Sequence, residues 1–111
     1  MESILTSIKS LLGIDESYEH FDSQIIMHIN TAIMELTQIG IGPPDGFRIE
    51  DASTTWDEFI GENDLRFEGV KTYIMLSVQL VFDPPPASVI ASAEKTLQRL
   101  AWRLSVAAES T

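Results

Sequence analysis

The stretch from Val70 to Phe82 is apolar almost all the way round a helix, and it ends abruptly at Asp83 and three consecutive prolines, Pro84–Pro86. A proline has no amide donor, fixes φ and pushes the residue before it away from the helical region. A helical pattern resumes after the prolines. The sequence therefore predicts a central helix that is contacted on several sides, and a separate last helix beyond it.

Hydrophobic periodicity predicts an all-α fold, a small four-helix domain that spans residues 1–111. Gly13 and Gly40 are expected to end the first two helices, and Asp22 is expected to cap the start of the second. Residues 105–111 are expected to form a flexible tail. The predicted helices lie near residues 3–12, 22–39, 64–82 and 88–104.

The second and third helices are expected to form the hub of the core, because both carry aliphatic residues at helical spacing. The methionines are interpreted as core filling rather than as a binding face. The expected hub residues are Val70, Ile74, Val78 and Val81 with Ile25, Ile29, Ile33 and Leu36, and the methionines are Met27, Met34 and Met75.

A long, irregular and acidic loop, residues 47–63, joins these two helices. Thr55–Ile60 could form one helical turn within it, with Thr54 or Thr55 as its cap. A loop of this length in a small domain is usually functional, so Phe47, Trp56 and Phe59 are candidate interface residues. For Trp56, burial in the core is the alternative.

The last helix offers a second set of candidates. Lys95, Arg99 and Arg103 lie away from its apolar stripe, and Trp102 lies beside that stripe. Tryptophan is common at the centres of interfaces, so an intersubunit contact and packing within the domain are both open for Trp102.

The charge of the chain is large and uneven. The net charge is −10, and residues 1–69 hold fourteen of the seventeen acids but only three of the seven bases. Affinity for nucleic acid comes from Lys and Arg that neutralise phosphates, so the acidity argues against DNA binding. The remaining interpretations are a solubilising surface, a surface that repels DNA, and a surface that meets a basic partner.

No group of residues encodes a reaction. Asp57 and Glu58 diverge on a helix, and His20 and His28 lack a third ligand for zinc. The chain has no cysteine, which excludes disulfides and thiolate sites and suits a reducing compartment. The sequence therefore predicts no enzymatic activity, no cofactor and no metal.

No signal peptide is expected at the start of the chain, and the longest strongly apolar run, residues 73–82, is too short to span a bilayer. The sequence therefore predicts no contact with a membrane.

Several stretches of the chain follow one another in a distinctive order and spacing. They are ILTSIKSLLG (Ile4–Gly13), FDSQIIMHINTAIMELTQIG (Phe21–Gly40), TWDEFIG (Thr55–Gly61), VKTYIMLSVQLVFDPP (Val70–Pro85) and a last helix that contains Trp102-Arg103-Leu104. Together they resemble the head–tail connector (head-completion adaptor) family of tailed bacteriophages, over about residues 3–104. The third proline departs from the two of the family pattern.

This resemblance implies a structural protein of the virion, at the head–tail junction, which is present in the bacterial cytoplasm during assembly or is encoded by a prophage. It implies a ring of roughly a dozen copies under the portal protein. Such a ring extends the DNA channel, helps to retain packaged DNA and docks the next head-completion or tail protein. DNA would pass through the channel without specific binding.

A second function remains open from the charge alone. An acidic regulatory or DNA-mimic protein would bind a basic protein partner, with an affinity that falls steeply with salt.

Overall fold

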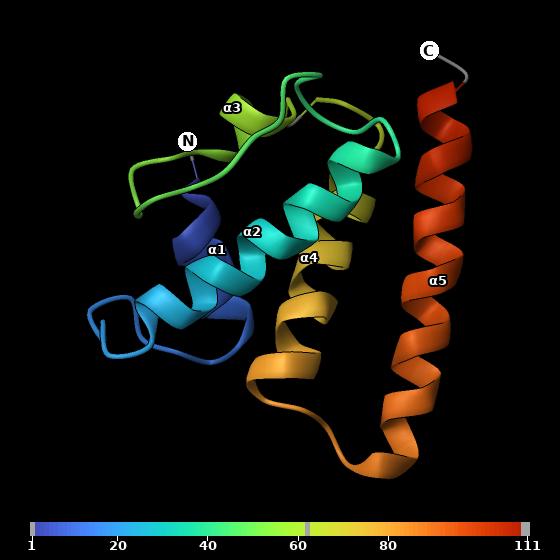
Figure 1. Ribbon diagram of the computed structural model, residues 1–111. Coiled ribbons are helices and arrows are strands. Elements are labelled where there is room, and N and C mark those ends of the chain that lie inside the picture. Colours follow the sequence, from blue (N-terminus) through green and yellow to red (C-terminus); the bar gives the residue numbers. More distant parts are fainter. Residues whose placement is uncertain (1, 62, 110–111) are drawn as a thin grey trace.

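A computed structural model describes residues 2–61 and 63–109 and shows an all-α fold, as predicted. Within the described residues there are no strands, only an isolated antiparallel bridge between Ser3 and Thr55. The helices are α1 (Ile4–Leu11), α2 (Asp22–Gln38), α3 (Trp56–Phe59), α4 (Phe67–Phe82) and α5 (Ala87–Glu109), arranged as in Figure 1.

Local hydrogen bonds explain several of the helix boundaries. Ser3 caps α1, because its hydroxyl accepts from the amide of Thr6 at 3.2 Å. The short α3 is the predicted turn: Thr55 is its N-cap, and the side chain of Glu58 accepts from the Thr55 amide at 2.7 Å. This reciprocal arrangement is a capping box.

Two predicted boundaries are wrong for physical reasons. Asp22 is not the cap of α2 but its first residue; Phe21 is in the N-cap position and makes no side-chain cap bond. Helix α4 begins at Phe67 rather than at Asp64, because the Asp64 carboxylate accepts from the amide of Arg66 at 2.8 Å and holds residues 64–66 in a turn.

Helix α5 continues five residues past its predicted end at Leu104. Its C-terminal part packs beside the end of α2: Ala108 is partly buried against the core, and its Cβ would lie 3.3 Å from a Cβ added at Gly40. Within the predicted tail, residues 105–109 are therefore helical, and residues 110–111 lie outside the described part of the chain. The flexibility of the tail stays a prediction.

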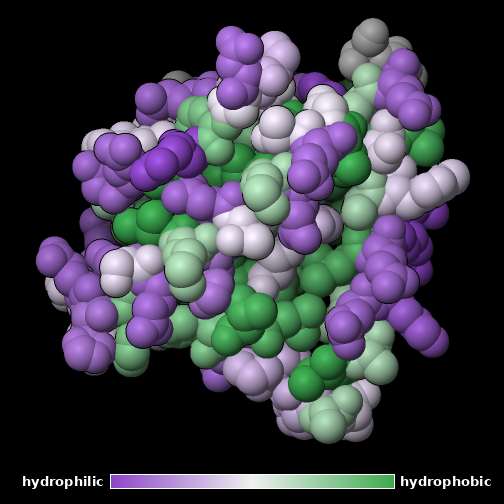
Figure 2. Space-filling view, viewed as in Figure 1, coloured by the Kyte–Doolittle hydropathy of each residue, from purple (hydrophilic) through white to green (hydrophobic). Residues whose placement is uncertain are grey.

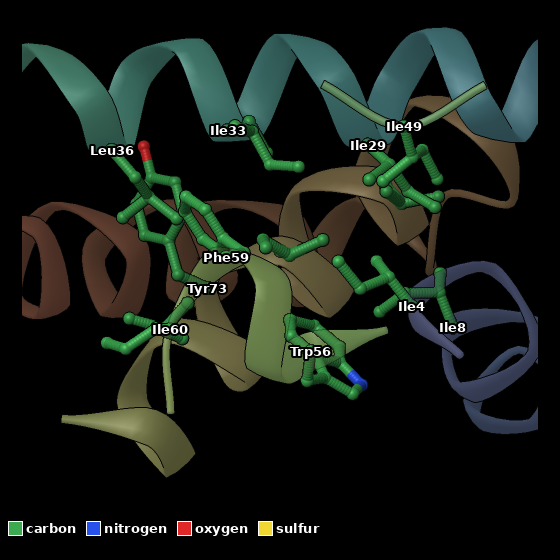
Figure 3. Close-up of a cluster of buried hydrophobic side chains, with 14 of the residues drawn as sticks. Ile4, Ile8, Ile29, Ile33, Leu36, Ile49, Trp56, Phe59, Ile60 and Tyr73 are labelled. Carbon is green, nitrogen blue, oxygen red and sulfur yellow. The ribbon is translucent and has the colours of Figure 1, made fainter. Parts of the chain in front are cut away.

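The core lies where α4 packs between α2 and α5, with α1 and the loop closing its other sides (Figure 1). Its members are the buried aliphatic and aromatic side chains shown in Figure 3. The predicted hub is confirmed for Ile25, Ile29, Ile33, Leu36, Val70, Ile74 and Val78.

The hub prediction is wrong for Val81, whose side chain is 61% exposed. Met27 and Met34 are also exposed, at 58% and 53%, so their interpretation as core filling is wrong. Met75 is partly buried against the core. Val81 is exposed because the N-terminal part of α5 leaves the groove open beside it, although the adjacent Phe82 packs against the ring of Phe21. The α5 side chains that pack against the core are Leu97, Leu100, Ala101, Leu104 and Ala108.

No helix in residues 2–61 and 63–109 combines the length and the apolar character that crossing a membrane requires.

Candidate interaction surface

The side of α5 that faces away from the domain carries an exposed tryptophan among basic side chains. Lys95, Arg99, Trp102 and Val106 recur at intervals of four, three and four residues, so they lie on one face of the helix. Arg103 borders this face. The buried Leu104 lies on the opposite side. We call these five residues, 95, 99, 102, 103 and 106, the outer face of α5.

Trp102 is the aromatic residue of this face, and its side chain is 67% exposed. Trp102 is not among the side chains that pack in or against the core, and its role in an intersubunit contact stays a prediction. A large, mostly exposed apolar side chain surrounded by polar ones is a common feature of contact surfaces.

The cations of the outer face differ from the other four in the chain. Lys9, Arg48, Arg66 and Lys71 each lie within 4 Å of a carboxylate oxygen of the chain, at distances from 2.7 to 3.6 Å. Among the described residues, no ion pair involves Lys95, Arg99 or Arg103. The cations that form no ion pair within residues 2–61 and 63–109 are therefore gathered on the face that carries Trp102.

A groove lies on the other side of α5, between its N-terminal half and the pair α2 and α4. Its volume is about 400 Å³. Figure 2 shows hydrophobic surface at this position, in the lower centre of the view, between hydrophilic surface on either side. The lining residues are His28, Thr31, Ala32 and Glu35 of α2, Ser77, Leu80 and Val81 of α4, and Ile90, Glu94 and Leu97 of α5.

Two carboxylates, Glu35 and Glu94, give this groove its charge. Tyr73 lines the adjoining hollow and donates from its hydroxyl to Glu35 at 3.2 Å. Burial, together with the negative charge of Glu35 and this hydrogen bond, raises the pKa of Tyr73 to about 12. The phenol therefore stays protonated at neutral pH and fixes the position of the Glu35 carboxylate.

The sequence interpretation missed the groove and also an exposed stripe on α2 that shares Thr31 with the groove lining. Met27, Thr31 and Met34 recur at four and three residues, on a different face from the buried stripe that includes Ile29 and Leu36. A second apolar stripe on a helix marks either a further internal contact or a surface for a partner. The exposure of both methionines shows that it is not an internal contact of this chain.

The aromatic residues of the loop lie inward. Trp56 lies in the cluster of buried side chains (Figure 3) and has no exposed surface. Its indole nitrogen donates to the hydroxyl of Ser7 at 2.9 Å. The same hydroxyl donates to the Glu2 carboxylate, which also pairs with Lys71 at 3.2 Å. These bonds hold the loop, α1 and α4 together, which is the core interpretation of Trp56.

Phe47 and Phe59 also stabilise the loop from within. Phe59 is buried, and the two rings stack with their centroids 5.1 Å apart. The side chain of Asn30 both donates to and accepts from the backbone of Ile49, at 2.9 and 2.8 Å. Apart from the partly exposed Phe47, the loop would meet a partner mainly through polar side chains, among them Arg48, Glu50 and Glu58.

Lys9 is a structural residue that the sequence interpretation did not identify. It is 2% exposed; its amine donates to the carbonyls of Glu16 and Tyr18 at 3.1 and 2.8 Å and pairs with Asp22 at 2.8 Å. It fixes the acidic turn after α1 onto the start of α2. Its position four residues after Leu5, on the apolar face of α1, was the available signal.

No three His, Asp or Glu side chains in the described residues are grouped so that they could hold a metal ion. His20 is exposed and His28 lines the groove. The predicted absence of metal, cofactor and activity stays a prediction.

Comparison with known proteins gives one family. The model of a family described as phage connector protein matches residues 4–111. No curated protein and no solved structure matches the chain.

Proposed function

The chain belongs to the phage connector family, and on this basis we propose that it forms a ring between the portal protein of a phage head and the next head-completion or tail protein. The family gives the chain a structural role in the virion. The ring of roughly a dozen copies, the extension of the DNA channel and the retention of packaged DNA are the parts that we add.

The distribution of cations is the observation that best supports this proposal. In a chain with a net charge of −10, the three cations without an ion pair in the described part of the structure lie with an exposed tryptophan on one helix face. Such a surface can bind another acidic protein, including a further copy of this chain. The rest of the exposed surface is acidic and would let DNA slide past it, because carboxylates do not bind phosphates.

The architecture also favours a structural role over catalysis. The groove contains two carboxylates, one histidine and two hydroxyl side chains, but His28 has no hydrogen-bond partner among the described residues that would orient it as a general base. We propose that the protein has no catalytic turnover.

Electron cryomicroscopy of virions tests the proposal directly. Density for this all-α chain, in a ring between portal and tail, is the expected result. Particles from a phage that lacks the gene are the control: their heads should package DNA but then lose it or fail to join tails. Virions without a copy of the chain between portal and tail would refute the proposal.

A chain truncated at Pro86 would not be a useful alternative to deletion of the gene. It would lack Leu104, which is buried, together with the other α5 side chains that cover α4. The shortened chain would expose this apolar surface, so loss of function would follow from unfolding. Substitutions on the outer face of α5 keep the core intact and separate the two effects.

A further inference from the structure

We infer that the groove between α2, α4 and α5 of one copy receives the outer face of α5, centred on Trp102, from the next copy. The inference rests on the proposed function because it takes the neighbours in the assembly to be copies of this chain. It goes further by naming the two surfaces that meet.

The two surfaces are complementary in shape. Trp102 is a large apolar side chain that projects from a helix into solvent, and the groove offers about 400 Å³ with an apolar floor that includes Leu80, Val81 and Ile90. A concave, mostly apolar site of this size is able to take a bulky side chain. The exposed Met27 and Met34 extend the apolar surface along α2 beside the groove, and methionine adapts readily to an incoming aromatic ring.

The two surfaces are also complementary in charge. The groove carries Glu35 and Glu94, and the outer face carries Arg99 and Arg103, one turn apart on either side of Trp102 in the sequence. Neither arginine is in an ion pair within the described residues. Contact would bring each arginine near a carboxylate, and it would exclude water from around the indole, as in the centre of a stable interface.

The placement of the surfaces defines the kind of assembly. Within one copy the outer face points away from the domain, whereas the groove lies on the side where α5 approaches α2 and α4. Because the two surfaces point in opposite directions, two copies related by a two-fold axis cannot each place an outer face in the groove of the other. Contact is head-to-tail, and a head-to-tail contact closes into a ring when the rotation between neighbours divides a full turn.

A charge-exchange experiment tests the pairing of the two surfaces. One full-length variant reverses the groove (Glu35→Lys with Glu94→Lys), and a second reverses the outer face (Arg99→Glu with Arg103→Glu). Each alone brings like charges together and should stay monomeric in light scattering of the purified protein. An equimolar mixture restores opposite charges at both contacts and should associate at least tenfold more strongly than either variant alone.

A matched control places two lysines at exposed acids that do not line the groove, Asp45→Lys with Glu50→Lys, in a chain that also carries the face reversal. Mixed with the face-reversed variant, this chain should not associate, because every groove and every outer face in the mixture is then acidic. Circular dichroism during heating identifies any variant that does not fold. A mixture that associates no more than its components, or no more than the control mixture, would overturn the inference.

Disulfide trapping gives a second readout that does not depend on reversing Glu35. Because the chain has no cysteine, each introduced thiol is the only one present. A Thr31→Cys chain in the groove and a Lys95→Cys chain on the outer face should form a mixed disulfide under mild oxidation. A Ser17→Cys chain, in the exposed turn after α1, should form far less with either. Equal yields for all pairs would contradict the proposed contact.

The outcomes separate this inference from the proposed function. If virions contain the ring but the two charge-reversed variants do not associate in a mixture, the proposed function stands and the proposed contact is rejected. If the variants associate but virions contain no copy of the chain, the proposed contact stands and the proposed function is rejected. A third outcome is that the protein is monomeric in every sample and that Trp102 is protected from a fluorescence quencher only when heads are added. The partner of the outer face would then be the portal or another head protein, and the inference would be overturned.

Discussion

At the scale of single residues, glycine and charged side chains decide how the loop is held. Gly42 has a positive φ of +85° and lies against the Phe59 ring: a Cβ there would come within 2.9 Å of Cδ1. Phe59 is buried and stacks on Phe47, so it has little room to yield. The residue at position 42 therefore affects both the backbone and the packing under the loop.

Substitution of Gly42 should reveal both effects. Gly42→Ala is expected to destabilise by about 1–2 kcal/mol through its backbone conformation, and by at least about 1 kcal/mol more through the clash with Phe59. Gly46→Ala is the control, since Gly46 has φ +96° and nothing lies within 4 Å of an added Cβ. Equal losses in urea unfolding of the two variants would show that Phe59 moves aside.

A carboxylate before α4 makes stability depend on pH. Hydrogen bonds from the Arg66 side chain and amide lower the pKa of Asp64 from 3.8 to about 2. Because the folded-state pKa is the lower one, the stabilisation is fully present above pH 3.8 and is lost as the pH falls towards 2.

Asp64→Asn should therefore reduce the free energy of unfolding at pH 6, by less than about 1 kcal/mol because the pair is partly solvated. The difference from the unsubstituted chain should disappear near pH 2. Parallel acid titrations of the two chains, followed by circular dichroism, measure this convergence. A difference that is constant across the titration would exclude this pair as its source.

At the scale of the helices, α4 is buried over most of its length but leaves one side of its last turn exposed. Ile74 has no exposed surface, whereas Val81, seven residues later, is 61% exposed. Seven residues are two turns, so the two side chains point in similar directions. The difference between them arises because the N-terminal half of α5 leaves the groove open beside Val81.

Truncation of these two residues should separate core from surface. Ile74→Ala is expected to cost about 2–4 kcal/mol, the range for removing a buried aliphatic side chain. Val81→Ala should stay within about 0.5 kcal/mol. Chemical denaturation measures both, and a loss below about 1 kcal/mol for Ile74→Ala would contradict its burial.

Hydrophobic periodicity was sufficient to predict the helices and most of the hub. Residues such as Ile25, Ile29 and Ile74 lie on regular helices, α2 and α4, that bury each other's apolar faces. Periodicity failed for Val81 and Met34, since a pattern shows that a face is apolar but not whether the chain itself covers that face. The outer face of α5 was predicted from its charges. The groove was not, because it forms only when three helices come together in space.

At the scale of the whole molecule, charge determines which partners are accessible. Four of the seven cations are neutralised by carboxylates of the chain, and the others lie on one helix face. The surface that remains is acidic and has no basic strip along which a DNA backbone could bind.

The free protein should therefore show no measurable affinity for duplex DNA at low salt, and no dependence of its hydrodynamic behaviour on added DNA. Fluorescence anisotropy of labelled duplex measures this. The face-reversed variant, Arg99→Glu with Arg103→Glu, is the control and should give the same result. Salt-dependent binding that this variant abolishes would assign the outer face to DNA rather than to protein.

The three prolines between α4 and α5 set a geometric parameter of the assembly. They contribute no amide donors and restricted φ values, so they fix the direction in which α5 leaves α4. If both contact surfaces involve α5, this direction fixes the rotation from one copy to the next and thereby the number of copies that closes a ring. Deleting Pro86, which leaves two prolines, should produce rings of a different symmetry or open helical filaments, and the symmetry of a phage neck would then depend on the length of a proline linker.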